Sequence, residues 1–124
     1  MARQFRVKRV YAPAERGDGL RVLVDRLWPR GIAKEKARID LWLKDVSPSG
    51  ELRRRVHADP KAWDAFVLDY AHELAREPAR SAADELRKRL RKGPVTLLYA
   101  ARNAEHNNAV ALKRLLEEGG KRRP

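Results

Sequence analysis

Two apolar runs in this sequence predict strands that are buried on both faces. Residues 22–24 (VLV) and 95–101 (VTLLYAA) have strand length, and glycine or proline lies close to each run. We extend the first of these strands over residues 21–27. A further strand is expected over residues 4–11, where Phe5 and Val7 alternate with basic residues, as on a strand with one wet face.

Residues 38–46 fit two patterns. Ile39, Leu41 and Leu43 alternate as in a strand, whereas Ile39, Trp42 and Val46 would share one face of a helix. We favour a strand, because the segment ends abruptly at the SPSG sequence of residues 47–50.

Periodic apolar positions predict the helices. The clearest helix covers residues 60–76, where Trp63, Phe66, Tyr70 and Leu74 recur at intervals of three and four after an Asp-Pro start. A helix start is expected over residues 51–56, a helix capped by Ser81 should end at residue 92, and another should run from residue 103 or 104 to about 118. The order of elements predicts one α/β domain over residues 1–118, with about four strands in an at least partly parallel sheet covered by helices, and a frayed basic tail at 119–124.

The amino-acid composition excludes cysteine chemistry and bears on which partners the chain can have. The chain has no cysteine, which excludes disulfides, thiolate ligands and a cysteine nucleophile, and it has no apolar run of membrane-spanning length. We expect a cytoplasmic protein without a membrane partner. Lysine and arginine number 29 against 17 acidic residues, a net charge of +12, which favours anionic partners or reflects a compositional bias towards arginine.

The first polar cluster follows the strand at 21–27. Asp25, Arg26, Trp28 and Arg30 lie where the predicted strand gives way to a turn at a proline and a glycine. Ligands of α/β sheets bind at such strand ends. The alternatives are a structural ion pair between Asp25 and an arginine, and a tryptophan that belongs to the core.

The second cluster follows the strand at 95–101. If Asn103 caps the next helix, the first-turn N–H groups and Arg102 would form a cradle for a phosphate or carboxylate, and His106 would transfer protons or bind the anion. The alternative is that these residues only cap the helix. If the two strands are parallel, both clusters lie at the same carboxyl edge of the sheet.

The chain resembles the YeaO-like family of small bacterial proteins, which carry domain of unknown function 488. The resemblance rests on the successive motifs DRLWPRG, WLKDVSPSGELR, DPKAWDAFVLDY and VTLLYAARNAEHNNAVAL, which cover nearly the whole chain in order. It implies a compact α/β domain of the bacterial cytoplasm and supplies no activity. The family pattern also marks Tyr99, His106 and Asn107, and it usually has aspartate where this chain has Asn103.

We therefore expect a site for a small phosphorylated or carboxylated ligand at the carboxyl edge of the sheet. Asp25 and His106 are the candidates for catalysis. The candidates for ligand binding are Arg26, Trp28, Arg30, Tyr99, Arg102 and Asn107. No motif identifies a metal site or a cofactor, and the oligomeric state is left open. Two alternatives remain, a nucleic-acid-associated module that binds through the basic face of residues 87–92, and an interaction protein without chemistry.

Overall fold

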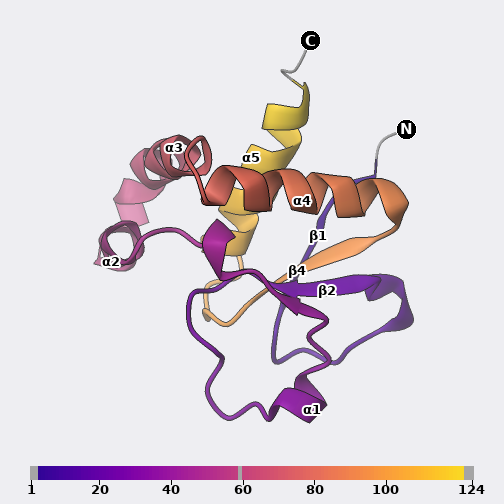
Figure 1. The fold of residues 1–124 in the computed structure, drawn as a ribbon. Coiled ribbons are helices and arrows are strands. Elements are labelled where there is room, and N and C mark those ends of the chain that lie inside the picture. Colours follow the sequence, from indigo (N-terminus) through magenta and orange to yellow (C-terminus); the bar gives the residue numbers. More distant parts are fainter. Residues whose placement is uncertain (1–2, 59, 122–124) are drawn as a thin grey trace.

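A computed structural model describes residues 3–58 and 60–121, which form a single small α/β domain (Figure 1). Its strands are β1 (Arg6–Arg9), β2 (Leu20–Leu23), β3 (Leu41–Trp42) and β4 (Val95–Tyr99). Its α-helices in the described residues are α1 (Lys34–Ala37), α2 (Gly50–Ala58), α3 (Trp63–Leu74), α4 (Ala79–Lys92) and α5 (Asn108–Lys121). Short 3₁₀ turns lie at Arg16–Asp18, Lys44–Val46 and Pro60–Ala62.

The four strands form one parallel sheet in the order β1-β4-β2-β3. Strand β4 lies in the interior of the sheet, and all five of its residues are buried, which explains its unbroken apolar run. Strands β2 and β4 pair directly and in parallel, with Leu20 opposite Val95. The predicted parallel arrangement is therefore confirmed, and both strands end at the same edge of the sheet.

The two faces of the sheet are covered differently (Figure 1). Helices α3, α4 and α5 pack on one face, where Val22 and Leu97 meet Phe66, Leu86 and Leu112 in the main core. The opposite face carries a smaller cluster of Val10, Leu23 and Leu98, covered by side chains from the segment between β2 and β3 and from β3 itself, including Trp28 and Trp42. The segment after Asp25 therefore covers the second face of the sheet.

A buried ionic cluster fixes the start of β2. Asp18 accepts hydrogen bonds from the guanidinium of Arg21, from Lys8 Nζ at 3.2 Å and from the backbone N–H of Glu15 at 3.0 Å. Asp18 and Arg21 are only 4% and 5% exposed. Gly19 follows with φ of 64°, and a Cβ there would lie 2.2 Å from the carbonyl oxygen of Pro94, so the close approach of β2 to β4 requires glycine.

Several boundaries differ from the sequence prediction. The strand expected over 38–46 is only the pair Leu41–Trp42 followed by a 3₁₀ turn, and helix α1 was not predicted. The helix expected over 60–76 divides into a 3₁₀ turn and α3. Helix α4 begins at Ala79, so Ser81 is not its cap. The hydroxyl of Ser81 instead donates a hydrogen bond to the carboxylate of Glu77.

The last helix begins later than predicted. Its cap is Asn107, whose side-chain Oδ1 accepts a hydrogen bond from the Val110 N–H at 2.9 Å, so the helix starts at Asn108 and not near Asn103. The helix continues to Lys121, three residues beyond the predicted end, and residues 122–124 lie outside the described part of the chain.

Candidate functional site

The carboxyl ends of β2 and β4 are tied together by side chains. Oδ2 of Asp25 accepts a hydrogen bond of 2.9 Å from the backbone N–H of Ala100, the first residue after β4. Nδ2 of Asn108 donates to the carbonyl of Val24 at 3.0 Å. The segments that follow β2 and β4, which carry the two predicted polar clusters, therefore meet at one edge of the sheet.

A cavity of about 360 Å³ opens at this edge, within the size range of small-molecule sites. We call it the strand-edge pocket. Its walls come from the residues that follow β1, β2 and β4, from helices α2 and α3, and from the start of α5. The lining residues are Tyr11, Asp25, Leu27, Trp28, Pro29, Arg30, Arg53, Phe66, Ala100, Ala101, Asn107 and Asn108.

Asp25 is the carboxylate of the strand-edge pocket. Burial raises its pKa, while hydrogen bonds from Asn108 and Ala100 and the positive charge of Arg53 oppose the rise. No salt bridge joins Asp25 to any residue in the ranges 3–58 and 60–121, so the ion pair with Arg26 or Arg30 considered above does not form there.

Two tryptophans hold the loop that carries Asp25 and Arg30. Nε1 of Trp42 donates to the backbone carbonyl of Asp25 at 2.8 Å, and Nε1 of Trp28 donates to the carbonyl of Ile32 at 2.8 Å. The two indoles pack edge to face with ring centres 5.3 Å apart. Trp28 therefore both packs against the smaller apolar cluster and forms part of the pocket wall.

Arg30 and Arg53 supply the cationic groups of the strand-edge pocket. The backbone of Arg30 is fixed by a 2.9 Å hydrogen bond from the Tyr11 hydroxyl to its carbonyl. Neither guanidinium has a hydrogen-bond or salt-bridge partner among the described residues. Their N–H donors are thus free to meet an acceptor that enters the pocket.

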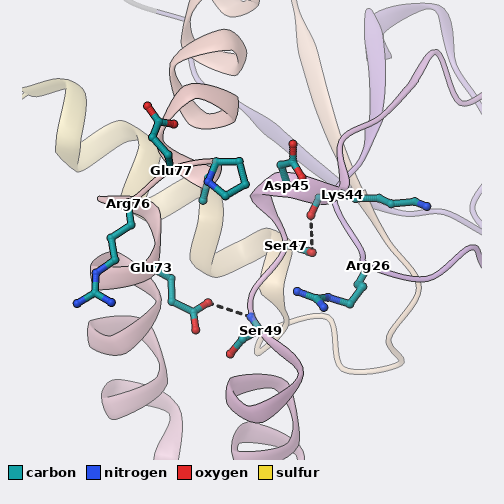
Figure 2. Close-up of a pocket in the computed structure, with 10 residues that line it drawn as sticks. Arg26, Lys44, Asp45, Ser47, Ser49, Glu73, Arg76 and Glu77 are labelled. Carbon is teal, nitrogen blue, oxygen red and sulfur yellow. Dashed lines mark hydrogen bonds between the residues drawn. The ribbon is translucent and has the colours of Figure 1, made fainter.

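Arg26 lies elsewhere. It lines a different cavity of about 450 Å³, between the loop before α2 and the turn from α3 to α4. Figure 2 shows its side chain directed towards Ser47 and Ser49, with Glu73 accepting a hydrogen bond from the Ser49 N–H at 2.9 Å. Adjacent residues in the chain, Asp25 and Arg26, therefore contribute to separate cavities.

The second predicted cluster is only partly brought to the strand-edge pocket. Asn103 Oδ1 accepts hydrogen bonds from the N–H groups of Glu105 and His106, both at 2.9 Å, so these groups are not free for an anion. The His106 ring stacks on Trp63, with centres 4.4 Å apart and planes at 13°. It does not line the pocket.

The remaining predicted residues have three different positions. Tyr99 is 4% exposed and belongs to the main core, on the face of the sheet that α3, α4 and α5 cover. Arg102 is exposed and is not part of the pocket lining. Asn107 lines the pocket, but its side-chain oxygen caps α5 and its Nδ2 donates to the carbonyl of Asn103 at 2.9 Å.

Eight lining residues were not predicted as site residues: Tyr11, Leu27, Pro29, Arg53, Phe66, Ala100, Ala101 and Asn108. Arg53 directly follows the sequence SPSGEL at residues 47–52. This sequence predicts a helix start there, but it gives no reason to place Arg53 near Asp25. The helices α2 and α3 bring Arg53 and Phe66 to the sheet edge. In the described part of the chain, no group of three or more potential metal ligands is found.

Comparison with known proteins identifies the family. A family model described as the inactive DUF488-N3 subclade matches residues 4–124. The chain belongs to this subclade.

Curated relatives agree with this assignment. The chain is 45% identical to "Uncharacterized protein YeaO" of Escherichia coli K12 over 107 residues, which covers 85% of this chain and 90% of that protein. It is 42% identical to "Uncharacterized protein Rv3073c" of Mycobacterium tuberculosis H37Rv over 113 residues, covering 91% and 93%. The resemblance to YeaO-like proteins is thus confirmed.

No solved structure matches the chain. None of the helices within residues 3–58 and 60–121 has the length and apolar character needed to cross a bilayer.

Proposed function

We propose that this domain binds a small phosphorylated or carboxylated compound in the strand-edge pocket and does not transform it. The observation that carries the proposal is the pair of guanidinium groups, Arg30 and Arg53, which line a cavity at the carboxyl ends of three parallel strands and have no partner among the described residues. Guanidinium groups bind carboxylates and phosphates through paired hydrogen bonds.

The pocket also offers apolar surface for the body of a ligand. Trp28, Pro29 and Phe66 line it, and Leu27 is 63% exposed beside them. Leu27 adds apolar surface beside the indole of Trp28 in the pocket lining. An interaction protein without a ligand would be favoured by a dry edge with Asp25 paired to an arginine, and that arrangement is absent from the described residues.

Two observations support binding over catalysis. The predicted catalytic pair does not converge, because Asp25 lines the pocket while His106 stacks on Trp63 outside its lining. The subclade to which the chain belongs is also described as inactive. In this proposal Asp25 orients the ligand.

The test is a thermal-shift series with inorganic phosphate, phenyl phosphate and benzoate on three proteins. Wild type should be stabilised by at least one probe, and Arg53→Ala should lose most of that shift. Arg54→Ala is the matched control, because it removes the same charge from the next position of α2 and Arg54 is exposed and outside the pocket lining. Equal shifts in the two variants would show that the probes act through general charge, and the proposal would fail.

A nucleic-acid-associated role is the second candidate, and exposed lysine and arginine side chains on α4 favour it. Lys88, Arg91 and Lys92 are exposed, whereas Arg87 and Arg89 are engaged by Asp84 and Glu85. Binding to a labelled duplex should then weaken with salt, with a slope of about −0.9 per phosphate contact in the log-log plot. Replacing Lys88, Arg91 and Lys92 together by alanine should make that slope less steep. Absence of binding by the wild-type protein at low salt would remove this candidate.

A further inference from the structure

The strand-edge pocket carries a negative pole as well as a positive one. Asp25 faces the cavity, and a carboxylate has about four lone-pair directions for hydrogen bonds. The N–H of Ala100 and the side-chain amide of Asn108 are its hydrogen-bond partners. Capacity to accept further N–H donors therefore remains on the pocket side.

No cation of the described chain neutralises this carboxylate. Asp25 is partly buried, and no salt bridge joins it to a residue in 3–58 or 60–121. Arg53 influences it through its charge without a hydrogen bond. A carboxylate withdrawn from water without a paired cation is costly, and a ligand ammonium group would offset that cost.

Asn108 lines the same cavity and acts on Asp25 as a hydrogen-bond donor. Asn108 uses its Nδ2 to bind the carbonyl of Val24, which directs the amide nitrogen towards the backbone of β2. Its Oδ1 has no partner among the described residues and belongs to a side chain that lines the same cavity. The negative pole of the pocket is therefore the carboxylate of Asp25.

The geometry points to a zwitterionic ligand, an amino carboxylate with an apolar side chain, whose ammonium group binds Asp25 and whose carboxylate binds Arg53 and Arg30. Its apolar side chain packs against Trp28 and Leu27. This inference rests on the proposed anion-binding function and specifies the ligand class of the same pocket. A simple anion would leave Asp25 facing the anion's own charge, so the pocket discriminates by the amine.

Three probes of nearly equal size test the inference by calorimetric titration. L-phenylalanine carries both groups, 3-phenylpropanoate lacks the amine, and 2-phenylethylamine lacks the acid. We expect phenylalanine to bind at least about tenfold more tightly than either single-charge probe, since a charge-assisted hydrogen bond contributes a factor of this order. In Asp25→Asn the preference for phenylalanine over 3-phenylpropanoate should fall to about one, while 3-phenylpropanoate binds as well as before or better.

The comparison among probes on the wild-type protein stands even if the variant is destabilised. Equal affinity for phenylalanine and 3-phenylpropanoate would overturn the zwitterion inference and leave anion binding intact. Binding of phosphate or benzoate without binding of phenylalanine would have the same consequence, and tightest binding of 2-phenylethylamine would also overturn the inference. Failure of every anionic probe, with Arg53→Ala indistinguishable from Arg54→Ala, would instead remove the proposed function itself.

Discussion

Replacing Asp18 by alanine should destabilise the domain strongly, although Asp18 lies outside the candidate site. The change removes the carboxylate that the guanidinium of Arg21 contacts, and Arg21 is 5% exposed. Arg21 would keep only backbone acceptors, the carbonyl of Arg38 at 2.9 Å and that of Ala37 at 3.5 Å. An unpaired buried cation would remain next to the start of β2.

The expected magnitude follows from this burial. Breaking a buried ion pair by removing one partner costs about 3–5 kcal/mol. We expect the lower end, about 3 kcal/mol, because the side chain of Lys8, the third member of the cluster, is 17% exposed and admits water. That loss would be a large part of the roughly 5–15 kcal/mol by which a domain is stable.

The assay is urea denaturation followed by circular dichroism at pH 7. Glu15→Ala is the control, because Glu15 bonds the same lysine but its side chain is 74% exposed, and pairs at the surface contribute little. A loss below about 1 kcal/mol in Asp18→Ala would contradict the buried ion-pair account.

The pH dependence of the same variant provides a second check. Burial acts to raise the pKa of Asp18, but hydrogen bonds from the Glu15 backbone, Lys8 and Arg21 outweigh it and hold the pKa below its ordinary value. The carboxylate therefore stabilises the fold above the unfolded-state pKa of about 4, and this contribution is lost as pH falls through the lower folded-state pKa. The stability gap between wild type and Asp18→Ala should be widest at neutral pH and should shrink below about pH 4.

Three further variants test hydrogen bonds that support the fold. Tyr70→Phe should cost about 1–3 kcal/mol, because the fully buried Tyr70 hydroxyl donates to the carbonyl of Val46 and its loss leaves that carbonyl unpaired; an unchanged urea midpoint would contradict this. Asn107→Ala should cost about 1 kcal/mol through loss of the α5 cap, and Asn103→Ala should cost less because Asn103 is exposed and closes only a local turn. Equal losses in the two asparagine variants would contradict the assignment of the cap to Asn107.

The sheet could be predicted because its central strands are buried on both faces. Apolar residues dominate both strands in the sequence, at 22–24 and 95–99, and the parallel pairing of β2 with β4 brings the segments that follow them to one edge. The helix α3 was equally clear, since its buried residues repeat at helical spacing.

Shorter elements carried less information. Strand β3 has two residues at the sheet edge, and Ile39 and Trp42 pack into the smaller cluster, so the segment fits neither periodicity fully. Helix α1 has four residues, too few for a periodic stripe. The start of α5 was misplaced because Asn103 and Asn107 both accept backbone N–H groups, and the pattern cannot say which one opens the helix.

The candidate site shows the same division. Asp25, Trp28 and Arg30 were found because they directly follow a strand that ends at the pocket. Arg53 was missed because helix packing, rather than sequence proximity, brings it to the edge. Arg26 was expected beside Asp25 but lies in another cavity, since the direction of a loop side chain depends on the packing of the loop (Figure 2).

The central claim is that the strand-edge pocket binds an anion through Arg30 and Arg53. A crystal structure of the wild-type protein soaked in phenyl phosphate tests it most directly. We predict the phosphate group within about 3 Å of both guanidinium groups, with the ring against Trp28. Phosphate bound only in the cavity of Arg26, or a strand-edge pocket without the probe at saturating concentration, would contradict the account.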